Sequence, residues 1–201
     1  MAHRRKPLAA ALALNTVVLV VELAGGIQAS SLSLVVDGVH NVSDEVALGF
    51  LVLAYALRAG LSGRLLRAAN LFNSIGLLAI SGLLLWRVLE RLSNPVPVLG
   101  LVPVIAGIVG AVGNWGVARV LREPAREDAA IRLAYVHNLG DTLLSLAPVA
   151  AGILVIASGQ AIFDSIVALV IAVAIVVTTV RSVVGSHREL LWADNVVCGH
   201  R

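Results

Sequence analysis

Two short stretches of the sequence repeat the same pair of side chains. His40 and Asp44 are four residues apart, and His137 and Asp141 repeat that spacing further along the chain. On an α-helix, residues four apart project from one face, one turn above the other. Two such faces turned toward each other would supply two imidazole nitrogens and two carboxylate oxygens, a ligand set that suits tetrahedral zinc. The spacing therefore predicts one metal site built from two helices.

The charges of these four groups favour an exchange of metal against protons. Two ionised aspartates and two neutral histidines carry two negative charges, which one divalent cation cancels. Without the cation, two carboxylates face each other in a poorly hydrated cavity, and binding protons relieves their repulsion. A site that holds either metal or protons is the physical basis of metal–proton exchange.

Composition places these helices in a lipid bilayer. Of the 201 residues, 59% are hydrophobic and 13% are charged, whereas about a quarter of the residues of a soluble domain are charged. A charged group near the bilayer centre costs roughly 2.5–3.5 kcal/mol. One His–Asp pair could be a hydrogen-bonded pair that stabilises helix packing. Two such pairs, each deep in its own helix, indicate a functional site.

Six apolar runs are long enough to span a bilayer, which takes roughly 20 residues. The linkers between them are short, so consecutive helices should be antiparallel neighbours. We expect an all-α membrane protein with six transmembrane helices in one bundle. It would comprise one domain over residues 1–190 and a short cytoplasmic tail over residues 191–201, with no soluble domain. The runs cover residues 8–26, 32–57, 69–91, 97–121, 129–157 and 162–184.

Basic residues predict the orientation of the bundle. Between and beyond the runs, the expected outer side has only Arg87 and Arg91, and all other clusters lie on the opposite side. By the positive-inside rule, both termini should be cytoplasmic. The cytoplasmic set is Arg4, Arg5, Lys6, Arg58, Arg64, Arg67, Arg119, Arg122, Arg126, Arg132, Arg181, Arg188 and Arg201.

The same composition argues against two other classes of protein. Aromatic residues make up only 4% of the chain, which leaves few groups on which nucleic-acid bases could stack. We therefore expect no nucleic-acid partner. Cys198 is the single cysteine, so a disulfide framework and a cysteine-rich metal site are excluded.

Further polar residues fall inside the apolar runs. Asp37 lies two turns before Asp44 and is either a relay carboxylate on the cation path or a helix-start residue that reaches interfacial water. Glu22 either lines an outer cavity or extends to the nearby interface. We expect interhelical hydrogen bonds from Asn15, Asn70, Asn73 and Asn114. Close packing within the bundle, rather than a dimer seam, is the expected role of Gly107, Gly110, Gly113 and Gly116.

These motifs resemble a known transporter family. Residues 31–44, SLSLVVDGVHNVSD, look like the second transmembrane helix of the cation diffusion facilitator family, and residues 134–141, AYVHNLGD, resemble its fifth. The resemblance also includes Glu22 with Gly25-Gly26, Glu90-Arg91 with Asn94-Pro95, and Phe163-Asp164. It covers about residues 8–190.

The resemblance implies a six-helix homodimeric exporter in a bacterial inner membrane. Such a protein exchanges cytoplasmic divalent metal for protons by alternating access, and the paired motif generally favours zinc, with cadmium or cobalt tolerated. The transport ligands carried over are His40, Asp44, His137 and Asp141, with zinc as the substrate and no organic cofactor. The cytoplasmic domain common in the family is not found in this sequence, so dimerisation would use membrane helices, with residues 71–92 as the candidate seam by analogy.

Two other functions fit the same residues. An intramembrane zinc hydrolase could use the four groups, although catalytic zinc usually keeps one position open for water, and no HExxH motif occurs. We therefore expect no enzyme activity. Alternatively, the chain could be a membrane partner or scaffold subunit whose paired motifs only stabilise packing.

Overall fold

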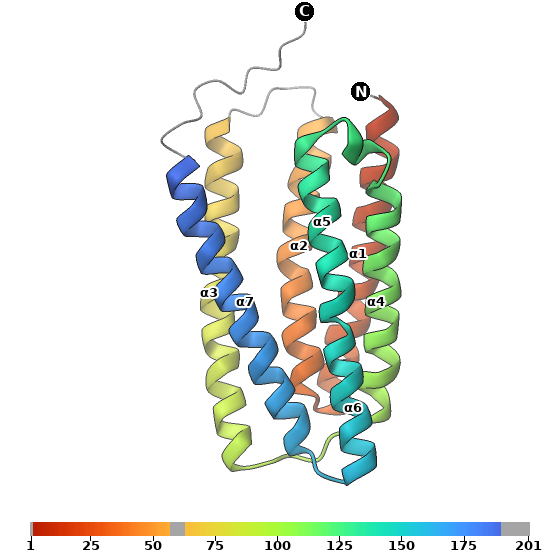
Figure 1. Cartoon of the computed structure of the whole chain (residues 1–201), viewed down its shortest axis with the longest axis vertical. Helices are drawn as coiled ribbons and strands as arrows, with labels where there is room; N and C mark the ends of the chain where they lie inside the picture. Colours follow the sequence, from red (N-terminus) through yellow and green to blue (C-terminus); the bar gives the residue numbers. More distant parts are fainter. Residues whose placement is uncertain (1, 57–62, 190–201) are drawn as a thin grey trace, which may run out of the picture.

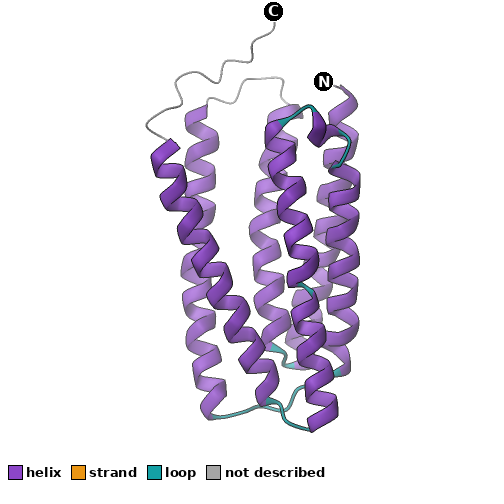
Figure 2. Ribbon diagram, in the orientation of Figure 1, coloured by secondary structure: helices purple, strands orange, loops and turns teal. Residues whose placement is uncertain are grey.

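The computed structural model describes residues 2–56 and 63–189, and this part of the chain is entirely helical. Figure 2 shows long helices joined by short loops, without strands among the described residues. The elements in chain order are α1 (Ala2–Ala29), α2 (Leu32–Ala56), α3 (Gly63–Ser93), α4 (Leu101–Leu121), the short 3-10 helix η1 (Pro124–Arg126), α5 (Ala129–Leu144), α6 (Leu146–Ser158) and α7 (Ile162–Glu189).

The described helices form a bundle with membrane character. Four segments are long and apolar enough to cross a bilayer, namely residues 6–29, 101–121, 130–158 and 162–181. Helices α2 and α3 do not meet the same criterion over their described residues, and α2 carries the acidic residues Asp37, Asp44 and Glu45. The chain is therefore an integral membrane protein built as a helical bundle.

The helices form two groups (Figure 1). Helices α1, α2, α4, α5 and α6 pack together, while α7 packs along α3 and meets α2 and α6 at one end. The first turn of α1 and the last turn of α7 lie at the same end of the bundle. Below, this end is called the terminal end, and the other the distal end.

Two apolar clusters lie between the helices, one joining the two groups and one within the larger group. One lies among α2, α3 and α7 and contains buried Val36, Val88, Ile171 and Ile175. The second lies near the terminal end, where α1, α2, α4 and α5 meet, and each of these four helices contributes one large, fully buried side chain. These side chains are Leu8, Leu48, Leu121 and Ile131.

The fourth helix begins later than the sequence suggests. We predicted a run from residue 97, but α4 begins at Leu101, and residues 95–99 are non-helical. Proline disfavours the helical conformation in the residue before it, and Pro95 and Pro97 impose that restriction twice in succession. Apolar composition alone did not reveal where the helix begins.

The fifth predicted run is not one continuous helix. Helix α5 ends at Leu144 and α6 begins at Leu146, with Ser145 as a turn residue between them. Pro148 has no N–H to donate to the carbonyl of Leu144, and its ring crowds that carbonyl. The run predicted over residues 129–157 corresponds to one candidate membrane span over residues 130–158, and a turn at Ser145 divides it into two helices.

Glycines in α4 allow two other helices to approach closely. A Cβ at Gly110 would overlap Oε1 of Glu22, and one at Gly113 would overlap Cγ2 of Val18, both on α1. A Cβ at Gly107 would lie 2.8 Å from Val149 Cγ2 and 2.9 Å from the Ser145 carbonyl oxygen. The predicted role of these three glycines in core packing is confirmed.

Candidate metal centre

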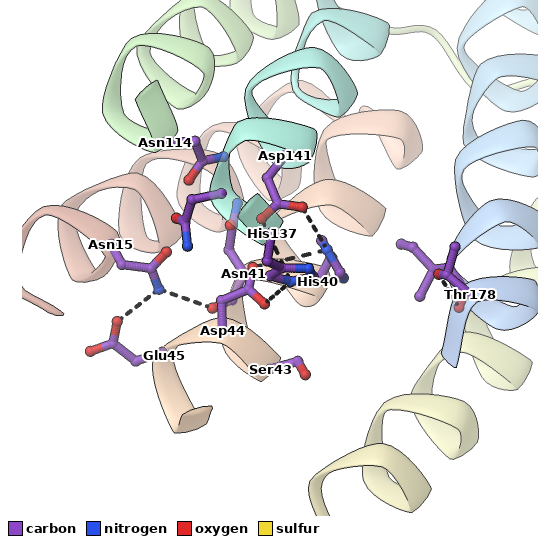
Figure 3. Close-up of polar contacts among 12 residues, drawn as sticks. Asn15, His40, Asn41, Ser43, Asp44, Glu45, Asn114, His137, Asp141 and Thr178 are labelled. Atoms are coloured by element: carbon purple, nitrogen blue, oxygen red, sulfur yellow. Dashed lines mark hydrogen bonds and ion pairs between the residues drawn. The ribbon is translucent and has the colours of Figure 1, made fainter. Parts of the chain in front are cut away.

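The two His–Asp pairs meet between α2 and α5. His40 Nε2 lies 3.1 Å from Asp141 Oδ1, and His137 Nε2 lies 2.8 Å from Asp44 Oδ1. Within each helix the corresponding separations are 3.9 Å for His40–Asp44 and 3.6 Å for His137–Asp141. One candidate ligand atom from each residue lies within 4.8 Å of all the others. Figure 3 shows the side chains converging from the two helices.

These separations suit a small tetrahedral ion. With metal–ligand bonds of about 2.0–2.1 Å, neighbouring ligands of tetrahedral zinc lie about 3.4 Å apart. The four measured distances, from 2.8 to 3.9 Å, lie on both sides of that value. Oδ2 of Asp44 and Oδ2 of Asp141 have no hydrogen-bond partner in the protein. These two oxygens are therefore free to bind a cation.

Three of the four side chains are buried, and the fourth is not. The side chains of His40, Asp44 and Asp141 are 9%, 5% and 6% exposed, whereas that of His137 is 47% exposed. Two acidic groups are thus held in a nearly dry part of the bundle, where isolated charges are costly. His137 is therefore the residue of the cluster with the largest exposed fraction.

Hydrogen bonds to α1 and α3 fix the position of α2. Glu45 accepts from Asn15 Nδ2 at 2.9 Å and from Thr16 Oγ1 at 2.6 Å, so its carboxylate points away from the cluster (Figure 3). On the α3 side, Asn73 donates to the Ser43 hydroxyl at 2.8 Å. Helix α2 is therefore held on two sides of the turn that carries Asp44.

The predicted interhelical role of the asparagines is confirmed where their side chains are described. Asn15 reaches the backbone carbonyl of Asn41 at 3.2 Å in addition to Glu45, and Asn114 donates to Ser145 Oγ at 3.2 Å. Asn73 reaches α2 as described above. The side chain of Asn70 lies outside the described residues.

Glu22 and Asp37 are both buried rather than interfacial. Glu22 is 0% exposed and Asp37 is 1% exposed. The hypothesis that Glu22 extends to the interface is therefore wrong, as is the hypothesis that Asp37 is a helix-start residue in contact with water. Asp37 is the sixth residue of α2, and Glu22 accepts a hydrogen bond from Asn41 Nδ2 at 2.5 Å.

One group that positions α2 was noted in the sequence only as part of a family motif. Asp164, in the first turn of α7, accepts hydrogen bonds at 2.6 Å from the hydroxyls of Ser31 and Ser33 and from the backbone N–H of Leu32. A carboxylate is favourable at a helix N-terminus, because the first N–H groups lack intrahelical partners. Asp164 therefore caps α2 from a distant part of the chain. Ser-x-Ser before an apolar run was the available signal for a cap.

The family profile described as "Cation efflux transmembrane domain" matches residues 8–191, which is most of the chain. This chain belongs to the cation efflux family. That membership confirms the resemblance to cation diffusion facilitators noted in the sequence, and it places the chain among transport proteins rather than enzymes.

Several bacterial members of the cation efflux family are similar in sequence. "Zinc transporter ZitB" of Escherichia coli (strain K12) is 29% identical over 182 residues, which cover 86% of this chain and 58% of the relative. "Cadmium, cobalt and zinc/H(+)-K(+) antiporter" of Bacillus subtilis (strain 168) is 28% identical over 165 residues, covering 77% and 53%. "Metal cation efflux system protein CzcD" of Cupriavidus metallidurans is 27% identical over 171 residues, covering 80% and 54%. The matched segments therefore span just over half the length of these relatives.

Proposed function

We propose that this chain exports zinc, or a similar divalent cation such as cadmium or cobalt, from the cytoplasm in exchange for protons. The observation that carries the proposal is the cluster of two imidazoles and two carboxylates between α2 and α5. His40, Asp44, His137 and Asp141 would bind the ion as substrate. The names of the relatives, which include zinc, cadmium and cobalt transport, support the same class of substrate.

The donor atoms favour zinc over harder cations. Imidazole nitrogen suits zinc and its neighbours, whereas magnesium and calcium prefer shells made of oxygen. Four protein ligands also leave no open position for the activated water of a zinc hydrolase, which is why transport is proposed and hydrolysis is not.

Proton exchange follows from the same donor set. Histidine and aspartate bind metal only when they are deprotonated, so protons and metal compete for the cluster. An alternating-access cycle would load metal from one side and protons from the other. A relative whose name includes "zinc/H(+)-K(+) antiporter" supports proton coupling.

The proposed topology has six membrane spans within residues 1–190. Helices α1, α2, α3, α4 and α7 would each cross once, and α5 with α6 would form one broken span. With the terminal end of the bundle in the cytoplasm, the clustered arginines lie inside, as the positive-inside rule requires. We place the protein in a bacterial inner membrane, and residues 191–201, which lie outside the described part, in the cytoplasm.

We also propose that two copies associate through α3. Among the described side chains of α3, five large apolar ones are exposed, and a partner helix or lipid must cover them. Cysteines introduced at Leu83 should crosslink two copies in membranes if this face is the seam, and cysteines at Leu154 on α6 should not. The five residues are Ile75, Ile80, Leu83, Trp86 and Leu89.

Zinc flux into proteoliposomes tests the transport proposal. The wild-type chain should accumulate zinc when a pH gradient is imposed, and Asp141→Ala should lower that flux by at least about 100-fold, because a ligand is lost. Glu90→Gln is the matched control, since Glu90 is an exposed carboxylate far along α3 that pairs with Arg87. If the wild type accumulates no zinc, transport is rejected. If Asp141→Ala transports zinc at the wild-type rate, this ligand set is rejected.

Metal binding at several pH values tests the exchange proposal. Zinc affinity should fall as the pH is lowered from about 8 to about 6, because protons then compete for the four ligands. An affinity that stays constant over this range would contradict exchange at the cluster. A scaffold protein would instead bind no zinc, yet unfold when Asp44 or Asp141 is replaced by alanine.

A further inference from the structure

A second acidic pair lies beside the metal centre, toward the distal end. Asp37 precedes His40 by three residues on α2, and Glu22 lies near the distal end of α1. Glu22 Oε2 accepts a hydrogen bond from Asn41, which is one helical turn beyond Asp37 on the same face. A Cβ at Gly38 would lie 3.1 Å from the backbone nitrogen of Leu23, so α1 and α2 cross closely at the residues that follow Asp37 and Glu22.

Each carboxyl group of this pair has one oxygen without a partner. Asn41 occupies one oxygen of Glu22, and Oε1 has no hydrogen bond from the protein. Oδ2 of Asp37 also has no hydrogen-bond partner. Both residues are almost completely buried. A buried polar atom without a partner is costly, and a proton between two carboxyl oxygens would remove that cost.

In the described parts of α1 and α2 that carry the pair, no lysine or arginine occurs from Pro7 to Ala56 to neutralise two charges. His40 follows Asp37 by three residues on α2, and it is already engaged with Asp141 of α5 in the metal centre at 3.1 Å. Helix α4 presents Gly110 to Glu22, and α6 contains no titratable residue. Two carboxylates this close cannot both remain ionised in a buried site, as in other carboxyl pairs that share one proton.

We propose that Glu22 and Asp37 share one proton and form a proton-carrying site separate from the metal ligands. This inference rests on the proposed metal–proton exchange and adds one proton to it. A divalent cation at the nearby cluster favours the ionised form of a carboxyl group. Metal entry would therefore release the shared proton, and metal exit would allow the pair to bind one again.

The broken helix provides a reason for the position of the pair. Ser145, the turn residue between α5 and α6, is buried and accepts a hydrogen bond from Asn114 at 3.2 Å, and a Cβ at Gly110 would lie close to both Glu22 Oε1 and Ser145 Cβ. The pair thus lies where the fifth span is interrupted, one turn past Asp141. Movement of α6 relative to α5 would change the surroundings of the shared proton and of the metal at the same time.

Proton release on zinc binding tests the inference. Purified full-length protein in weakly buffered detergent solution is mixed with zinc sulfate, and a pH indicator counts the protons released per zinc bound. Glu22→Gln and Asp37→Asn should each release one proton fewer than the wild type, and the double variant no fewer than either alone. Zinc affinity should change by less than about tenfold, because no ligand is removed. Glu90→Gln should behave as the wild type.

A measurement on the wild-type protein tests the shared proton even if a variant fails to fold. Infrared difference spectra of the wild-type protein should contain the C=O stretch of a protonated carboxyl group that disappears when zinc is added. Unchanged proton release in folded Glu22→Gln and Asp37→Asn, or the absence of that band, would overturn the shared proton. A wild type that binds no zinc would instead reject the proposed function.

Discussion

The two groups of helices are held together in different ways. Helices α1, α2, α4, α5 and α6 share an apolar cluster near the terminal end, but they also meet through glycines and hydrogen bonds: Gly38 lies against the backbone of Leu23, and Gly100 against Gly152. Helices α3 and α7 meet through aliphatic side chains, which include Val88 and Ile171. On α3, a Cβ at Gly76 or Gly82 would have nothing within 4 Å, so neither glycine brings another helix close.

This difference indicates which part of the molecule can move. Lipid is as apolar as leucine, so aliphatic side chains gain little by contacting one another rather than lipid. Among the described residues, α7 and α3 contact each other through aliphatic side chains, so a small slide of one along the other breaks no hydrogen bond between these two helices. Separating α1 from α2 would break the hydrogen bonds of Glu22 and Glu45 in a dry environment, where each lost partner is costly. We therefore expect α7 and α3 to adjust against each other more easily than α1 and α2 do, while Asp164 of α7 and Asn73 of α3 keep the two groups joined through α2.

The largest loss of stability should come from adding a methyl group where Gly110 of α4 lies against Glu22 of α1. Gly110→Ala places a methyl group on the Glu22 carboxyl and should lower the free energy of unfolding by about 3 kcal/mol, the upper part of the range for overpacking. Gly116→Ala is the matched control, since its nearest neighbour would be Leu14 Cδ1 at 3.7 Å, an ordinary contact. Reversible denaturation in mixed micelles measures both. Equal losses in the two variants would argue against close packing as the cause.

The next largest loss of stability is expected for Asp164, which connects α7 to the start of α2. Asp164→Ala leaves the hydroxyls of Ser31 and Ser33 and the N–H of Leu32 without their acceptor, which should cost about 2–3 kcal/mol. Asp164→Asn keeps one acceptor oxygen and should recover part of that loss. Thermal unfolding followed by circular dichroism compares the variants. If Asp164→Asn is no better than Asp164→Ala, hydrogen bonding to the start of α2 is not what Asp164 contributes.

A smaller effect is expected inside the aliphatic interface. Ile171 is 1% exposed between α7 and its neighbours, and Ile171→Val should lower the free energy of unfolding by less than about 1 kcal/mol. Zinc flux should be maintained, because the interface has no directional contacts to lose. A large loss of flux without loss of stability would show that this interface is shaped as specifically as the glycine contacts on α4.

The smallest expected change in the free energy of unfolding is a gain in stability. Gly82 on α3 has open space where a Cβ would lie, so Gly82→Ala should stabilise the helix by about 0.5–1 kcal/mol through helix propensity. The same denaturation assay at low protein concentration checks this value. Destabilisation that grows with protein concentration would instead mean that a second copy packs closely on α3.

Much of the architecture could be predicted from the sequence. Apolar length and composition indicated an all-helical membrane bundle, and proline and glycine indicated most of the boundaries. They did not reveal the break at Ser145, because the effect of Pro148 on a long apolar run depends on which neighbouring groups replace the lost hydrogen bond. The roles of Glu22 and Asp37 also needed the neighbours that bury them.

Sequence by itself determined which side chains lie on one helical face, because the spacing of His40 from Asp44, and of His137 from Asp141, is a local property of an α-helix. Only the tertiary structure decided that the two faces meet, with each imidazole nearest the carboxylate of the other helix. It also buried Glu22 and Asp37 inside the bundle and placed Asp164 at the start of α2. These contacts join residues far apart in the chain, and they depend on how closely the helices pack rather than on any spacing along the sequence.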